Sequence, residues 1–240
     1  MEKNKLVSYG LILGLCMVAS AGLVSQTLLK LKRMDDNLLV SSGSARMAVV
    51  SDSVKWVSNF SRTVEKKDLN SGYIEMRNDE AKVLKFLKDK GIKDEEIGIS
   101  PVFANEVWKS DSGAPKEYNL IQTVEVRSSE VDKIKNLAKD IQGLVNEGVF
   151  FSINSVEYYY AKLPEARIGL LPEAVKDARM RADKIAEASG KKVVGIQSVN
   201  MGIVQVLAPN SVDVSDYGSY DTASVDKEIM VTVRPTFILK

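Results

Sequence analysis

The feature that most constrains this chain is a run of uncharged residues near its N-terminus. Between Lys5 and Lys30 lie 24 consecutive residues without a charge, Leu6 to Leu29. As a helix this run would be roughly 36 Å long, whereas the hydrocarbon core of a bilayer is about 30 Å thick. The sequence therefore predicts a single transmembrane helix, with the anchor and a polar junction over residues 1–37 and a folded body over residues 38–240.

A cleaved signal peptide is the alternative interpretation of this run. Lys3 and Lys5 precede the apolar stretch Leu11–Val18, and Ala19-Ser20-Ala21 resembles a cleavage site. Uncharged sequence continues for eight residues beyond Ala21, which favours a retained helix. Lysine and arginine flank the run on both sides, so the charge rule leaves its orientation open.

Composition excludes several classes of function. Lys and Arg number 33 against 32 Asp and Glu, a net charge of +1 that gives no overall attraction to nucleic acid. The chain has no histidine, which excludes Ser-His-Asp catalysis and the usual zinc sites. Its single cysteine, Cys16, lies in the uncharged run, so the body has no thiol nucleophile. We therefore expect a protein that is not an enzyme and has no catalytic, cofactor-binding or metal-binding residues.

Hydrophobic periodicity predicts a body of strands and helices. The expected strands are Leu38–Val50, Ser53–Val64, Ile97–Trp108, Tyr118–Val126, Val149–Tyr160, Val193–Leu207 and Val225–Leu239. The first two are expected to form a hairpin around Ser51-Asp52, and the third and fourth another hairpin around the loop Ser110–Pro115. The expected helices are Tyr73–Lys90, after a break at Asp68–Gly72, then Glu130–Gln142, and a helix that begins near Pro164 and Pro172 and runs to Ser189. The inner face of this last helix is expected to be Val175, Ala178, Ala182 and Ile185.

This order of elements predicts an α+β fold. Ser53–Arg127 and Val149–Leu239 each have the order strand-helix-strand-strand, and the helix Glu130–Gln142 joins these two halves. Hairpins pair directly, whereas helices must cover a sheet face. We therefore expect a mainly antiparallel sheet covered by helices.

Three groups of side chains are candidate sites. The first, on the last helix, is Asp177, Arg179, Arg181 and Asp183, and its i,i+4 spacing favours ion pairs on a solvated face. The second is Asp213, Asp216, Asp221 and Asp226 with Gly218, which lacks the spacing of a calcium loop and is typical of a mobile acidic loop.

The third candidate is the run of three tyrosines Tyr158, Tyr159 and Tyr160. Such rings can stack a sugar or a base, but a tyrosine run is more typical of a strand in which alternate rings are buried. Serines and lysines are plentiful, yet no motif singles out a Ser-Lys pair.

Five stretches resemble the SIMPL-domain family, a widespread bacterial group of poorly defined function. They are Glu173–Gly190 with the following Lys191–Val199, then Val124–Tyr158, Gly91–Pro101 and Val40–Trp56. The resemblance implies an extracytoplasmic location, an α+β fold and a tendency to form oligomers, and family members are associated with the cell envelope, antigenicity and sometimes oxidative stress. It supplies no catalytic residues.

Together these features predict a non-enzymatic envelope protein that associates with copies of itself. We expect it to be held in the cytoplasmic membrane by one helix with its body outside the cytoplasm, or to be periplasmic or secreted if the helix is cleaved. The alternatives are a module that binds a small ligand such as a cell-wall fragment, and, less favoured, a hydrolase of unusual type.

Overall fold

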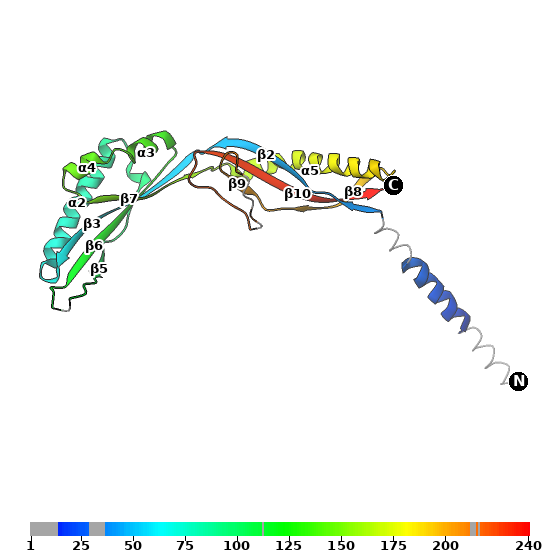
Figure 1. Cartoon of the computed structure of the whole chain (residues 1–240), viewed down its shortest axis with the longest axis horizontal. Helices are drawn as coiled ribbons and strands as arrows, with labels where there is room; N and C mark the ends of the chain where they lie inside the picture. Colours follow the sequence, from blue (N-terminus) through cyan, green and yellow to red (C-terminus); the bar gives the residue numbers. More distant parts are fainter. Residues whose placement is uncertain (1–13, 29–36, 112, 212–214, 216) are drawn as a thin grey trace, which may run out of the picture. The chain divides into compact units, whose positions relative to one another are not determined.

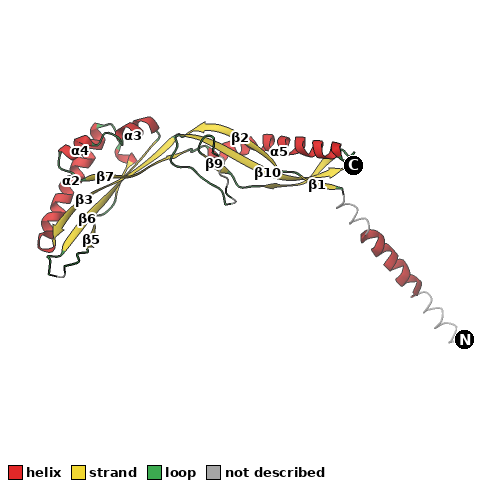
Figure 2. Cartoon of the chain, in the orientation of Figure 1, coloured by secondary structure: helices red, strands yellow, loops and turns green. Residues whose placement is uncertain are grey.

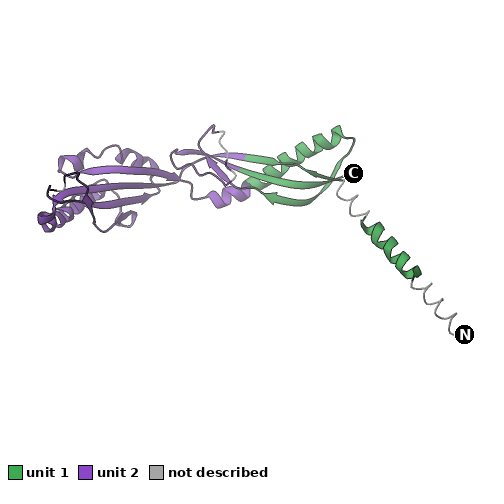
Figure 3. Ribbon diagram, turned by 60° about the horizontal axis from the view of Figure 1, so that its bottom comes forward, with its two compact units in different colours: residues 1–45, 170–203, 231–240 green, residues 46–169, 204–230 purple. Residues whose placement is uncertain are grey.

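The structure, a computed structural model, describes residues 14–28, 37–111, 113–211, 215 and 217–240 (Figure 1). It has an α+β fold with two antiparallel sheets, as the order of elements predicts (Figure 2). The chain forms two compact units (Figure 3): residues 1–45, 170–203 and 231–240 belong to unit 1, and residues 46–169 and 204–230 to unit 2.

The N-terminal segment is described only in part. Residues 14–28 are helical and exposed. Among the residues that the structure describes, no helix combines the length and the apolar composition needed to cross a bilayer. The predicted spanning helix Leu6–Leu29 also includes residues 6–13 and 29, which lie outside the described residues, so the membrane anchor stays a prediction.

Sheet B, in unit 2, is built on one long strand, β3 (Ser53–Glu65). β3 pairs with β6 (Glu117–Ser128) along almost its whole length and with β7 (Phe151–Tyr159) on its other side. The short strands β4 (Ile97–Ile99) and β5 (Phe103–Val107) pair with β6, and β5 and β6 form the expected hairpin.

Three helices cover one face of sheet B: α2 (Leu69–Asp89), α3 (Val131–Leu137) and α4 (Gln142–Asn146), with one-turn 3-10 helices at Lys66–Asp68 and Asp94–Glu96. Alternate residues of β3 and β6 face them, because successive side chains of a strand point to opposite sides. The core below the helices holds large side chains, among them Trp56, Phe60, Met76, Leu87, Leu120 and Ile134, each at most 1% exposed.

Sheet A is organised around the C-terminal strand β10 (Asp226–Leu239). β1 (Leu38–Val40), β2 (Gly43–Val50), β8 (Val193–Met201) and β9 (Gln205–Leu207) all pair with β10. β1 and β8 both pair with residues 236–238, so they lie on opposite edges of β10. The helix α5 (Leu163–Ala188) packs on this sheet with Ala174, Ala178 and Ala182 against Val233 and Phe237.

The expected hairpin of Leu38–Val50 with Ser53–Val64 is wrong, because these strands belong to different sheets. The residues between them bind elsewhere instead of closing a turn. The Ser51 amide donates to the Val225 carbonyl at 2.9 Å, and the Asp52 amide donates to the Tyr159 carbonyl at 3.0 Å. The two predicted halves are therefore regrouped: sheet B takes β7 from the second half, and the N-terminal strands join sheet A.

Three helix predictions need correction. Helix α2 begins at Leu69, so the break at Asp68–Gly72 is wrong; Gly72 is buried there, where an added Cβ would lie 2.9 Å from a Leu120 methyl. The helix predicted over Glu130–Gln142 ends at Leu137, and a second short helix, α4, begins only at Gln142. The amides of Lys139 and Asp140 donate to the carbonyls of Asn136 and Leu137, which closes α3 in a tight turn.

The inner face of α5 is an alanine row that confirms Ala178 and Ala182 of the predicted face; Val175 is partly buried beside it, and only Ile185 is wrong. Ala174, Ala178, Ala182 and Ala186 are buried, whereas Ile185 is 50% exposed. Pro172 lies inside the helix. Two expected strands are each divided in two, Ile97–Trp108 into β4 and β5, and Val193–Leu207 into β8 and β9.

Candidate functional site

The charged group on α5 forms the expected ion pairs and one contact that the sequence did not indicate. Arg181 donates through Nε to Asp177 Oδ1 at 3.2 Å and forms an ion pair with Oδ2 at 2.9 Å, and Arg179 lies 3.8 Å from Asp183. Asp177 Oδ2 also accepts the backbone N–H of Ser44 at 2.9 Å, and this bond, followed by the contact with Arg181, lowers the pKa of the carboxyl. Asp177 therefore fastens the start of β2 to α5.

The close contact of β2 with α5 also explains why residue 43 is a glycine. A Cβ at Gly43 would lie 2.3 Å from the Ala174 carbonyl oxygen and 2.3 Å from the Ala178 amide nitrogen, so only glycine allows β2 to pass this close to the helix. Asp177 of this charged group thus has a structural role, whereas Arg179 and Asp183 form an exposed ion pair.

The acidic segment is anchored where the structure describes it. Asp213 and Asp216 lie outside the described residues, Gly218 has a positive φ of 88°, and Asp226 is the first residue of β10. The Asp221 carboxylate accepts the backbone N–H groups of Ala223 and Ser224, both at 3.1 Å. Burial raises the pKa of Asp221, but the bonds from Ser224 and Ala223 outweigh it and hold the pKa below its ordinary value. Within the described part of the chain, no group of three potential metal ligands comes together.

Lys227 is a residue that sequence reasoning missed. Its side chain is 0% exposed, and its ammonium group donates to the backbone carbonyls of Asp221 and Ser224 and to the Asp221 carboxylate at 3.4 Å. Burial lowers the pKa of Lys227 despite the nearby Asp221 charge. The available signal was its position, since Lys227 continues the alternating inward row Ile229, Val231 and Val233 on β10.

Tyr158 and Tyr159 end β7 and face opposite sides of the sheet, as expected, whereas Tyr160 follows the strand. Tyr158 is buried in the core of unit 2, and Tyr159 points to the face of sheet B away from the helices. The Tyr159 hydroxyl donates to Glu157 Oε2 at 2.6 Å, and this bond, with burial, raises the pKa of Tyr159 to about 12. The ring of Tyr159 lies 5.7 Å from that of Tyr220, whose hydroxyl accepts the amide of Tyr160.

Beside Tyr159 the open face of sheet B is hollowed. A cavity of about 320 Å³ is lined by Ser53, Val54, Lys55, Arg127 and Tyr159 from the three strands β3, β6 and β7. We call it the Lys55–Arg127 hollow. Of the three candidate groups in the sequence, only the tyrosines contribute to it.

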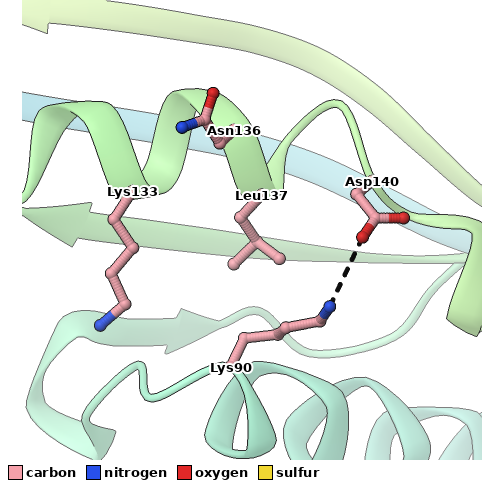
Figure 4. A pocket seen from close by; sticks show the side chains of 5 residues that line it. All are labelled: Lys90, Lys133, Asn136, Leu137 and Asp140. Carbon is pink, nitrogen blue, oxygen red and sulfur yellow. Dashed lines mark hydrogen bonds and ion pairs between the residues drawn. The ribbon is translucent and has the colours of Figure 1, made fainter.

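A second hollow of about 340 Å³ lies where the end of α2 meets α3 (Figure 4). Both of its ammonium groups are engaged: Lys90 pairs with Asp140 at 3.5 Å, and Lys133 donates to the Gly91 carbonyl at 2.8 Å and contacts Glu130. Leu137 fills the space between them (Figure 4). These contacts fasten α3 to α2 and leave no cation for a ligand.

The strand β8 carries an exposed apolar surface. Its described side chains are uncharged, and the outer edge of β8 has no strand partner among the residues described. Five apolar residues on and just after β8 are 41 to 65% exposed: Val194, Ile196, Val199, Met201 and Ile203. We call these five residues and the free edge the β8 surface.

The comparison with family models identifies the protein family. The SIMPL model, described as a protein of unknown function (DUF541), matches residues 39–237. The chain belongs to the SIMPL family. The resemblance drawn from the signature helix and the neighbouring stretches is thus confirmed, and this SIMPL domain includes both sheets. A search among curated proteins gave no match.

Proposed function

We propose that this SIMPL protein is a non-enzymatic, membrane-anchored protein of the cell envelope whose body associates with copies of itself through the β8 surface. The observation that carries the proposal is the strand β8, whose outer edge has no partner strand among the described residues and whose exposed side chains include several apolar ones. Monomeric proteins usually protect such edges with charged side chains, proline or coverage by another element.

β8 lacks the first two protections. Its sequence, Val193 to Met201, has no charged residue and no proline. Two bulges interrupt its pairing with β10 near Val194 and Gln197, but Ser198–Met201 pairs regularly with Val233–Thr236. This regular segment can accept a further strand, which would gain main-chain hydrogen bonds and cover Val199 and Met201.

A second copy is the occupant that fits this surface best. An edge of this kind can pair with itself around a two-fold axis, or with the β1 edge of a neighbouring copy to build a ring. Neither arrangement requires a charge on the partner, which agrees with the neutral surface.

The anchor rests on the sequence. Leu6–Leu29 has the length of a membrane-spanning helix, and residues 14–28 of this run are helical. An anchor would hold the bodies in one plane and raise their effective concentration, so a weak edge contact would suffice for assembly. The extracytoplasmic side rests on the family resemblance, and the absence of histidine and of a thiol in the body supports a role other than catalysis.

The test compares two lysine substitutions in the full chain purified in detergent. Met201→Lys places a charge on the β8 surface, and Met180→Lys places the same charge on α5, where Met180 is 54% exposed against 65% for Met201. By analytical ultracentrifugation, the wild type and Met180→Lys are expected to associate, and Met201→Lys to dissociate about tenfold more readily. Equal association of the two variants, or a monomeric wild type at every concentration, would contradict the proposal.

Cysteine cross-linking identifies the partner edge. In a Cys16→Ser background, Ser198→Cys or Asn200→Cys near a two-fold axis would form a disulfide dimer, because the Cα atoms would approach to about 4.4–6.8 Å. Lys184→Cys, on exposed α5, is the control and should stay reduced. Cross-linking of the control to the same extent would show random collision instead of edge pairing.

A further inference from the structure

Two positive charges lie directly opposite each other on the open face of sheet B. In the ladder of β3 with β6, Lys55 pairs with Arg127. Side chains in such pairs have Cβ atoms about 4.5–5.5 Å apart, and like charges there are destabilising. Selection of a stable sheet alone would not favour this pair.

Each cation has one carboxylate partner, Glu157 for Lys55 and Glu125 for Arg127, but Glu125 uses only the Nε–H group of Arg127. On the other side of β3, Lys55 pairs with Glu157, and their charged atoms form an ion pair at 3.4 Å. The Glu157 carboxylate also accepts hydrogen bonds from the Tyr159 hydroxyl at 2.6 Å and the Ser155 hydroxyl at 2.9 Å. These two bonds, together with the Lys55 charge, lower the pKa of Glu157. Arg127 donates through Nε to Glu125, and its two terminal nitrogens have no acceptor among the described residues.

The space between these groups is the Lys55–Arg127 hollow. Its volume of about 320 Å³ is at the lower end of the range for small-molecule sites. The Tyr159 ring forms one wall, fixed from behind by Tyr220 and by its own bond to Glu157. Ser53, which pairs with Tyr159 across β3 and β7, adds a hydroxyl.

We propose that this hollow binds a small molecule that carries a carboxylate or a phosphate, with the oxyanion between Lys55 and Arg127 and the rest of the ligand against Tyr159. An arginine with two free terminal N–H groups suits the two oxygens of either anion. The oxyanion also removes the repulsion between the two cations. The site lies within unit 2 and does not depend on the association of copies through β8.

The probes share one sugar ring and differ in charge. Glucuronate carries a carboxylate, glucose 6-phosphate carries a phosphate, and glucose carries neither. Binding to the full-length protein in detergent is measured by isothermal titration calorimetry at low salt. One or both anions should bind with a Kd on the order of 1 mM, at least about tenfold tighter than glucose, and the contact should weaken as salt is added.

Substitutions of the two cations should weaken anion binding, and a substitution of the neighbouring carboxylate Glu125 should strengthen it. Arg127→Gln should weaken anion binding about tenfold, and Lys55→Gln should do the same. Glu125→Gln removes the carboxylate that competes for Arg127, so it should tighten binding about threefold. Arg181→Gln, which removes an arginine paired with Asp177 on α5, should leave the affinity unchanged.

The two anions report the chemistry of the natural ligand. Tighter binding of glucuronate indicates a carboxylate, and tighter binding of glucose 6-phosphate a phosphate. Binding of glucose as tight as that of both anions would overturn the proposal, as would binding of none of the three or an equal loss in Arg181→Gln and Arg127→Gln. Far-ultraviolet circular dichroism of each variant checks that the fold is intact.

Discussion

The two sheets of this SIMPL domain are covered in different ways. Sheet B lies under three helices and buries large side chains such as Trp56 and Phe60, whereas sheet A lies under α5 and buries the alanine row. Large side chains fill the core when helix and sheet lie farther apart. A row of alanines fills it only when the backbones of helix and sheet lie close together. One closely packed helix covers little width of sheet, which leaves the edge strand β8 with exposed apolar residues. The way a sheet is covered thus determines whether its edge is available to a partner.

The largest effect is expected in the core of sheet B. Trp56 is 1% exposed and packs edge-on to Phe151 with ring centroids 6.1 Å apart, so Trp56→Ala should lower the free energy of unfolding by about 3–5 kcal/mol. The other tryptophan, Trp108, is 85% exposed, and Trp108→Ala should change it by less than about 0.5 kcal/mol. Urea denaturation followed by circular dichroism measures both. Similar losses for the two variants would contradict the assignment of this core.

The close approach in sheet A is tested with two glycines. Gly43→Ala places a Cβ against the backbone of α5, and because backbone atoms cannot move aside it should cost about 1–3 kcal/mol. Gly169→Ala, inside α5 with no atom within 4 Å of the added Cβ, should be neutral or stabilise by up to about 1 kcal/mol. Thermal unfolding of the two variants gives the comparison, and equal melting temperatures would argue against the close packing.

Lys227 sharpens the comparison because it is polar, whereas Ile229, Val231 and Val233 of the same inward row of β10 are apolar. Lys227→Met keeps the volume but leaves the carbonyls of Asp221 and Ser224 without their donor, which should cost about 1–2 kcal/mol. Lys184→Met, at an exposed position, is the control. A stabilised Lys227→Met variant would show that the buried ammonium is not needed to hold this segment.

The smallest effect concerns Asp177 and depends on pH. Its pKa in the fold lies below the ordinary value of 3.8, because Ser44 and Arg181 stabilise the carboxylate. Its contribution to stability is therefore complete above about pH 3.8 and is lost as the pH falls through the folded pKa. Asp177→Asn should flatten this part of the acid unfolding curve. An unchanged curve between pH 2 and 4 would remove Asp177 from the contact between α5 and β2.

The sequence predicts local structure well and long-range pairing poorly. Alternation located β3, β6 and β10 to within about two residues, because a half-buried strand imposes it on its own residues. Ser51-Asp52 looked like a hairpin turn since its partners, Val225 and Tyr159, are far away in the sequence. The same limit applies to the site: Tyr159 is visible as a candidate, but Lys55 and Arg127 become neighbours only through the register of β3 and β6.

Hydrogen–deuterium exchange of β8 tests the central claim most directly. Exchange is measured on the full-length protein in detergent at low and high concentration, and the amides of Ser198–Met201 are compared with those of β5. The account predicts that β8 becomes protected as the concentration rises while β5 does not change, because copies add to the free edge of β8. Exchange of β8 that is independent of concentration in a protein that nevertheless associates would contradict it.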